Sequence, residues 1–287
     1  MTMDSTDPPL AQPPLAASPT RPERSLHARR ARTFRSISAL MLREMSTTYG
    51  RSPGGYVWAL LEPIGAIAMF TLIISVGLRL RVPSVGVSFE LFFATGILTF
   101  RMAMRTASQV AASISYSRAL LFYPSVTYSD AVLARFLLQI ITHCTIFVIV
   151  ITGIILLFDT RAMPHLPSII TSLTMAAALG LGLGVLNAYL FPMFPLWKTI
   201  WGIVTTPLFF MSTVIYAFED LPAFGRDLIW YNPLVHIVGM MRRGLIGTYD
   251  ATWISPAYVF GLSFVLMLIG FAMLGRYYRA ITNREFD

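Results

Sequence analysis

The sequence predicts an all-α membrane protein with six transmembrane helices, an amino-terminal interfacial amphipathic helix, and re-entrant half-helices between spans 5 and 6. Three observations point to this class: 55% of the 287 residues are hydrophobic, only 13% are charged, and the mean hydropathy is +0.65. A soluble domain carries about 25% charged residues. The composition therefore excludes an ordinary soluble protein.

Residues 1–33 differ from the rest of the chain because they are rich in proline and arginine. This segment holds six prolines and few large apolar side chains, so it cannot bury a core, and we interpret it as a disordered cytoplasmic tail. A mitochondrial or plastid transit peptide would also be rich in arginine, but Asp4, Asp7 and Glu23 argue against it. We expect no cleavable signal peptide, and we assign residues 34–287 to one transmembrane domain.

Six apolar segments are long enough, or nearly so, to cross a bilayer, which takes about 20 residues. The candidate spans are residues 56–79, 89–110, 130–158, 168–191, 196–217 and 256–276. If the amino terminus is inside, fourteen basic residues fall on the cytoplasmic side and six on the opposite side, while Arg101 and Arg135 lie within spans and are not counted. This asymmetry predicts that both termini are cytoplasmic, and it explains the net charge of +8 without nucleic acid.

Residues 34–48 and 113–128 are expected to lie on the cytoplasmic side without crossing the membrane. The first segment is predicted to be an amphipathic helix at the interface. Its clustered side chains at helical spacing are Ile37, Leu40, Met41, Glu44 and Met45. The second is a short element interrupted by Pro124.

Two apolar stretches between spans 5 and 6 are too short to cross, and Asn232 and Pro233 divide them. We expect half-helices on the outer side. The positive end of the helix that starts at Asn232 could face an anion or an opening, and the alternative is a simple helix break buried in protein. The remaining candidates there are His236, Arg242 and Arg243, and both arginines are expected to face the periplasmic exit or lipid headgroups.

The chain contains no recognisable catalytic or nucleotide-binding motif. Lys198 precedes Thr199, but Trp197 stands where a phosphate-binding loop requires glycine. The histidines are scattered singly and Cys144 is the only cysteine, so we expect no metal site, disulfide or cofactor in this chain. The segment around Gly180, Gly182 and Gly184 predicts close helix packing.

Three segments resemble one family when they are taken together. "LMLREMSTTYGRSPGGYVWALLEP" and "ALLFYPSVTYSDAVLAR" resemble capsular polysaccharide exporter permeases, and "LPAFGRDLIWYNPLVHIVGMMRRGLIGTY" resembles type-2 ABC exporter permeases generally. The chain departs from the family pattern at Gly239, where many relatives carry an acidic residue. It also departs at Thr48, where many carry a basic one.

The resemblance implies a six-span permease of the bacterial inner membrane that forms a homodimer. It implies two copies of a separate cytoplasmic ATPase, which would bind ATP and magnesium, and export of a lipid-linked, anionic polysaccharide. Periplasmic and outer-membrane export proteins would be further partners. In the family the interfacial helix and the first cytoplasmic loop contact the ATPase. The corresponding candidates here are Arg43, Glu44, Tyr49, Arg118, Leu121, Tyr123 and Pro124.

Arg101 and Arg105 lie one turn apart in the second span and therefore share a face. A charge near mid-membrane costs about 2.5–3.5 kcal/mol on insertion scales and usually faces a cavity or a partner. One interpretation is a positive rail for an anionic glycan or lipid phosphate. The alternative is that Arg105 extends to the cytoplasmic surface while Arg101 pairs with Glu62 or backbone carbonyls.

Glu62 could pair with an arginine of the interfacial helix or of the second span, or could contact substrate. Aromatic rings can stack on sugars, which makes Tyr56, Trp58 and Trp201 channel candidates. Interfacial belts or core packing explain most such rings equally well. Tyr56 and Trp58 are the preferred exceptions, because they lie beside the polar approach to the first span.

Other functions remain as alternatives. An exporter of O-antigen, teichoic acid or another lipid-linked glycan would share the carboxy-terminal signature. A membrane glycan-modifying enzyme would need clusters of carboxylates or histidines near an interface. A proton-coupled transporter would need acidic residues in several spans, where the sequence offers Glu62 and Glu90.

Overall fold

A computed structural model describes residues 35–45, 55–73, 88–121, 126–158, 160 and 162–284, and this part of the chain is helical without strands. Residues 35–45 form the first helix. The helices that follow are α2 (Gly55–Leu72), α3 (Phe89–Ala111), α4 (Ser113–Leu121), α5 (Tyr128–Leu157), α6 (Leu166–Met193), α7 (Pro195–Phe210), the short η2 (Phe218–Asp220), α8 (Ala223–Trp230), α9 (Pro233–Leu245) and α10 (Pro256–Arg284). The predicted all-helical class is confirmed.

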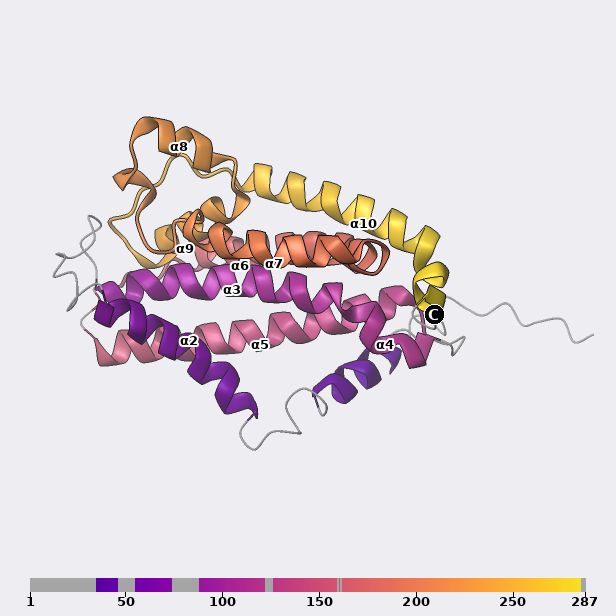
Figure 1. Cartoon of the computed structure of the whole chain (residues 1–287). Coiled ribbons are helices and arrows are strands. Elements are labelled where there is room, and N and C mark those ends of the chain that lie inside the picture. The colour runs from indigo at the N-terminus through magenta and orange to yellow at the C-terminus, as the bar shows by residue number, and fades with distance from the viewer. Residues whose placement is uncertain are drawn as a thin grey trace, which may run out of the picture.

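The long helices run side by side, and the short ones gather at the two ends of the bundle (Figure 1). Helix α6 lies centrally and packs along both α3 and α10, while α2 lies against α3 and α5. Helices α8 and α9 lie at one end of the bundle, and α4 lies at the other, close to the carboxy terminus. The short elements between the long helices therefore lie at opposite ends of the bundle.

Among the described residues, three helices are long and apolar enough to cross a membrane by length and composition: Tyr128–Leu157, Leu166–Met193 and Pro256–Ile281. The remaining candidate spans are shorter or more polar over the described residues. Helix α3 carries Glu90, Arg101 and Arg105, and α7 has 16 residues and ends at Phe210, before the predicted end at residue 217. The six-span arrangement stays a prediction.

Glycines on α6 allow its close approach to two neighbours. A Cβ on Gly180 would lie 2.8 Å from the Ala103 carbonyl oxygen, and one on Gly184 would lie 2.6 Å from the Val110 Cβ, both on α3. On the other side, a Cβ on Gly182 would lie 2.7 Å from the Ser263 carbonyl oxygen of α10. The predicted close packing is confirmed, and the spacing serves both neighbours.

Local sequence signals set several helix boundaries. Helix α5 begins at a capping box in which Thr127 and Asp130 satisfy each other's backbone N–H groups. Asn232 caps α9, and Pro233 occupies its first position, where no hydrogen-bond donor is needed. The predicted break at Asn232 and Pro233 is therefore confirmed, with one helix on each side.

Candidate functional site

A charged cluster joins α2 to α3 halfway along the bundle. One carboxylate oxygen of Glu62 accepts from both guanidinium groups, at 2.6 Å from Arg101 Nη2 and 2.7 Å from Arg105 Nη2. Arg101 pairs with Glu62, which is one half of the alternative to the positive rail. Arg105 makes the same pairing and does not extend away from the cluster. Glu62 was expected to pair with an arginine either of the interfacial helix or of the second candidate span. The structure shows the second of these, since both arginines belong to α3.

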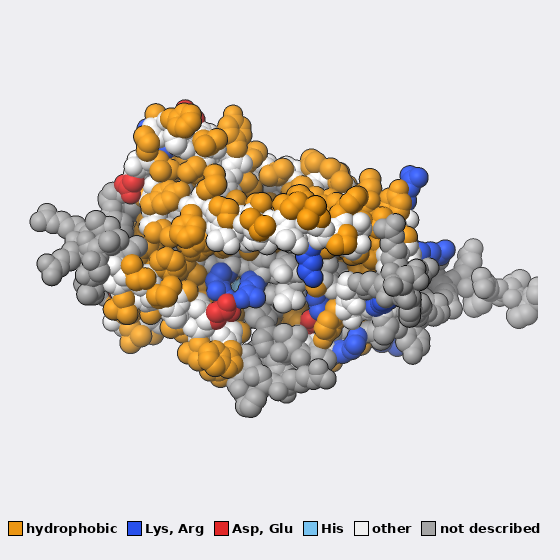
Figure 2. Space-filling model, viewed as in Figure 1, with side chains coloured by type: hydrophobic (Ala, Val, Ile, Leu, Met, Phe, Trp, Pro, Cys, Tyr) orange, Lys and Arg blue, Asp and Glu red, His pale blue; other side chains and the backbone are white. Residues whose placement is uncertain are grey.

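The cluster is open on one side. The side chains of Glu62 and Arg105 are about half exposed, at 49% and 50%, whereas Arg101 is 21% exposed. Basic and acidic side chains gather in a hollow of a largely hydrophobic face, over α3 and beside α2 (Figure 2). Two arginines against one glutamate leave one excess positive charge in an apolar surrounding. Such a group can attract an anion, because the charge is accessible and incompletely neutralised.

The aromatic candidates fall into different environments. Trp58 is 66% exposed on α2, close in sequence to Glu62. Trp201 is half-buried on α7, with its ring 6.3 Å from that of Trp197. Phe70, a further aromatic residue of α2, packs against Phe93 and Phe209 in the core. The side chain of Tyr56 lies outside the described residues.

A buried joint forms at the opposite end from α8, where the helix at 35–45 meets α5. Arg135 Nη2 lies 2.8 Å from Glu44 Oε1, and the two side chains are only 6% and 9% exposed. Arg135 Nη1 donates to the Gln109 carbonyl oxygen at 3.0 Å, and the guanidinium carbon lies 4.2 Å above the Tyr116 ring centre. This joint was missed from sequence, where Arg135 was only a charge within a span. The available signal was Glu44 among the apolar residues of an amphipathic helix.

The joint changes the interpretation of one ATPase-contact candidate. Glu44 is buried and its carboxylate is held by Arg135, so it does not lie on the surface that a partner would touch. Arg43 is exposed, and Arg118 and Leu121 are half-buried. Tyr49, Tyr123 and Pro124 lie outside the described residues, as does Thr48.

Arg242 corrects an expectation. It was expected to face the periplasmic exit or headgroups, but it is completely buried. Its Nη1 and Nη2 donate to the carbonyl oxygens of Tyr216 and Val214 at 3.0 and 3.1 Å, and its guanidinium carbon lies 3.8 Å from the Phe92 ring centre. The same turn holds Thr213 at a φ of 54°, which residues other than glycine rarely adopt. Arg242 therefore has a structural role: it holds this turn.

Arg243 remains about half exposed, and its Nη2 lies 4.0 Å from an Asp250 oxygen. His236, on the same helix α9, is buried and bridges two segments. His236 Nε2 donates to the Trp230 carbonyl oxygen at 2.8 Å, while Nδ1 accepts from the Ser255 N–H at 3.2 Å. This pattern requires the neutral ring, because a charged ring would have no acceptor.

Asn232 satisfies partners within the protein. Its Oδ1 accepts from the Leu234 N–H at 3.0 Å, and its Nδ2 donates to the Met211 carbonyl oxygen and the Ser212 hydroxyl. These contacts favour the interpretation of a helix break held by protein over that of an anion-binding helix end.

Glu219 organises the loop after α9 and was also missed from sequence. Its carboxylate accepts from the Tyr249 hydroxyl at 3.1 Å and from the Trp253 indole N–H at 2.9 Å. Burial and the neighbouring Glu219 carboxylate raise the pKa of Tyr249 above its ordinary value. The hydroxyl therefore keeps its proton and remains a donor.

Trp253 occupies the space into which a larger residue at position 239 would extend. A Cβ on Gly239 would lie 2.6 Å from the tip of the Trp253 ring. The acidic residue that the family resemblance leads us to expect at this position would therefore displace this ring. In this chain the indole takes the space, and its N–H binds Glu219 instead.

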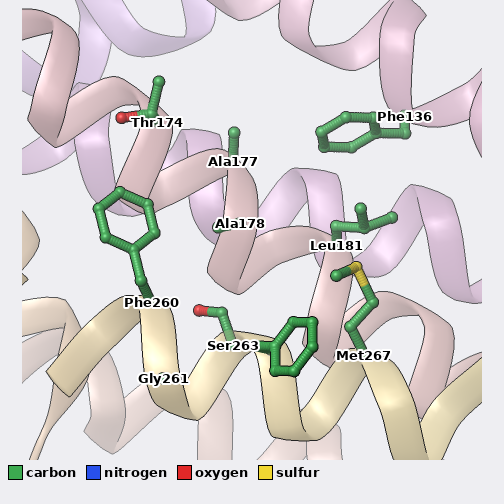
Figure 3. A pocket seen from close by; sticks show the side chains of 10 residues that line it. Phe136, Thr174, Ala177, Ala178, Leu181, Phe260, Gly261, Ser263 and Met267 are labelled. Atoms are coloured by element: carbon green, nitrogen blue, oxygen red, sulfur yellow. The ribbon is translucent and has the colours of Figure 1, made fainter. Parts of the chain in front are cut away.

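An apolar groove of about 710 Å³ lies between α6 and α10, with Phe136 of α5 at its edge (Figure 3). The hydroxyls in its lining are those of Thr174 and Ser263, and both donate to carbonyls of their own helices. This lining suits hydrocarbon rather than reaction chemistry. Within the described ranges, no group of three or more His, Cys, Asp or Glu side chains is placed to hold a metal ion.

The fold and these sites define a multi-pass helical membrane protein with a charged cluster opening on one face and polar networks at its ends. Residues 35–246 match the ABC-2 type transporter family, and the chain belongs to that family.

Three relatives match most of this chain and nearly all of their own length. The chain is 28% identical to the capsule polysaccharide export inner-membrane protein CtrC of Neisseria meningitidis serogroup B, over 86% of this chain and 92% of the relative. It is 25% identical to BexB of Haemophilus influenzae, of the same description, with the same coverage. It is 23% identical to the polysialic acid transport protein KpsM of Escherichia coli, over 83% of this chain and 92% of that protein.

Proposed function

We propose that this chain is the inner-membrane permease subunit of an ATP-driven exporter for a capsular polysaccharide. The observation that carries the proposal is the match to capsule export proteins over nearly their whole length, at 92% of CtrC and of BexB. The chain itself lacks a phosphate-binding loop, so ATP and magnesium would bind to a separate ATPase. Export rather than catalysis is then the work of this subunit.

We further propose six spans, formed by α2, α3, α5, α6, α7 and α10, with both termini in the cytoplasm. The helix at 35–45 would lie on the cytoplasmic interface, and α8 and α9 would be the outer half-helices. The break at Asn232 supports two half-helices. The excess of basic residues on the side of the membrane that holds the amino terminus supports the orientation.

A homodimer is supported by the exposure of the apolar helix α7. Within the described chain none of its residues is buried, although it is apolar and Ile203 is 67% exposed. Helix α2 likewise exposes Trp58 and Leu61. A second copy would cover these helices and leave the Glu62 cluster beside the interface.

The substrate route would then pass the Glu62 cluster. Arg101 and Arg105 would attract anionic groups of the glycan or its lipid phosphate, and Trp58 and Trp201 would offer rings to the sugars. Half exposure of Arg105 and the excess positive charge support this assignment. In the dimer, the helix at 35–45 and α4 of each subunit would contact one of the two ATPase copies. Periplasmic and outer-membrane proteins would receive the exported polysaccharide.

The test is deletion of this chain in its own cells, with staining of surface polysaccharide and affinity purification of a tagged copy. We expect loss of surface capsule, restoration by the wild-type copy, and co-purification of an ABC ATPase. Retention of the capsule together with loss of O-antigen or teichoic acid would transfer the function to that glycan. Normal surface glycans or the absence of an ATPase would contradict the proposal.

A further inference from the structure

Arg135 contacts the helix at 35–45, α3 and α4 from its position on α5. Its two terminal nitrogens point to different partners, Glu44 Oε1 at 2.8 Å and the Gln109 carbonyl oxygen at 3.0 Å. Its flat face covers the ring of Tyr116 on α4 at 4.2 Å. One side chain thus binds the elements that meet at the cytoplasmic end of the proposed topology.

The surroundings make this joint tight. Leu40, Ala131 and Ala134 are buried around the ion pair, and the space left beside it is about 10 Å³. Removing one member would leave the other charge buried without its partner, which is strongly destabilising. Separating the helix at 35–45 from α5 therefore carries a large cost in free energy.

The shape of the guanidinium is essential to this arrangement. Its planar fork reaches two acceptors in different directions while its face remains on an aromatic ring, which the single ammonium of lysine cannot do. Replacement of both charges by apolar residues of similar size is often tolerated by a fold. The joint can therefore be removed without unfolding the protein.

We propose that Arg135 is a positioning residue that binds the helix at 35–45, α4 and α5 into one rigid unit, through which displacement at the cytoplasmic surface reaches the membrane helix α5. The inference rests on the proposed function, which supplies the displacement from an ATPase. It adds that the interfacial helix acts by carrying α5 with it rather than by sliding over α5.

The first test measures rigidity in the full chain with Cys144 replaced by alanine. Spin labels are placed at Leu42, which is 67% exposed, and at Leu156 near the far end of α5, which is 80% exposed. We expect one narrow distance distribution, and at least a twofold broader one after Glu44→Met with Arg135→Met. Arg279→Gln, which removes a charge from the exposed end of α10, is the matched control and should leave the width unchanged. Equal widths in the double variant would overturn the inference.

The second test measures function in the permease purified with its ATPase and in cells. The double methionine variant should accumulate in the membrane and hydrolyse ATP, while export falls at least tenfold, so that more ATP is used for each exported chain. Arg135→Lys should recover part of the export, because its charge still meets Glu44. Export at the wild-type level in the double variant would contradict the role of Arg135.

A third test leaves Glu44 and Arg135 unchanged, so that the buried ion pair stays intact and its loss cannot unfold the protein. Met45 and Ile141 line the same space between the helix at 35–45 and α5. After both are replaced by cysteine in the Cys144→Ala background, a short bismaleimide bridges the two elements. We expect the bridged protein to export within about twofold of the single-cysteine controls, since a rigid unit needs no internal sliding. Loss of export in proportion to the bridged fraction would overturn the proposal.

These tests separate the inference from the proposed function. The distance widths need neither substrate nor ATPase, so they report on the rigid unit alone. If the wild-type chain shows a narrow width but neither export nor an ATPase, the proposed function fails and the rigid unit remains. If export is normal and the width does not change in the double variant, only this inference fails.

Discussion

Two arginine sites in this protein differ in burial and in the identity of their partners. Arg242 is fully buried, donates to two backbone carbonyls and covers the Phe92 ring. Arg101 and Arg105 are partly exposed and share one carboxylate oxygen of Glu62. The first site completes the hydrogen bonds of a strained turn, and the second leaves charge accessible from an apolar face. Burial and partners, rather than residue type, separate a structural arginine from a candidate ligand-binding one.

The largest effect is expected from Arg242→Gln. The two carbonyls would lose their donors and the space against Phe92 would be poorly filled, which we expect to cost about 3 kcal/mol or more. Thermal unfolding in detergent and the amount of protein in the membrane measure the loss. Arg243→Gln is the control on the same helix, because Arg243 is half exposed. An unchanged unfolding temperature in Arg242→Gln would break the comparison.

Arg101→Gln should affect export far more than stability. One of the two cations that would attract an anionic substrate is removed, and we expect export to fall about tenfold while the unfolding temperature stays close to wild type. Surface polysaccharide and the thermal unfolding of the same variant provide the measurement. Near-normal surface polysaccharide would exclude the positive rail. A large loss of stability would show that Arg101, like Arg242, has a structural role.

A smaller effect on stability is expected from Tyr249→Phe, because the hydroxyl that binds Glu219 is removed. The cost should be about 1 kcal/mol. Since the pKa of Tyr249 is raised in the folded state, both states keep the proton below about pH 9, and this group gives no pH dependence there. Above its ordinary value of 10.0 the unfolded state loses the proton first, so stability should decrease as pH rises. An unfolding series from pH 6 to 11 tests the sign, and the phenylalanine variant should lack the decrease.

The smallest effect is expected from Pro233→Ala. The Asn232 cap and its contacts to Met211 and Ser212 remain, so α9 should still begin at the same place. Export should stay within about twofold of wild type. A tenfold loss would return the outer helix end to the list of functional sites, and would weaken the assignment of this end as scaffold.

Sequence reasoning worked best where the signal is local. The break at Asn232 and Pro233, the short helix before α2 and the packing role of Gly180 and Gly184 follow from residue conformational preferences and spacing. The joint at Arg135 could not be found in this way, because Glu44 and Arg135 are far apart in the chain. The position of Arg242 was predicted wrongly for the same reason: its acceptors belong to the turn after α7.

The sequence by itself determined the helical membrane class, most helix boundaries and the family resemblance, because hydropathy, proline and glycine act over short distances. The tertiary structure alone decided which charges are satisfied. It placed Arg242 inside, joined Glu44 to Arg135, and left the Glu62 cluster open. The physical reason is that the free energy of a charge in an apolar surrounding depends on its solvent exposure and partners. Both are set by helices brought together from distant parts of the chain.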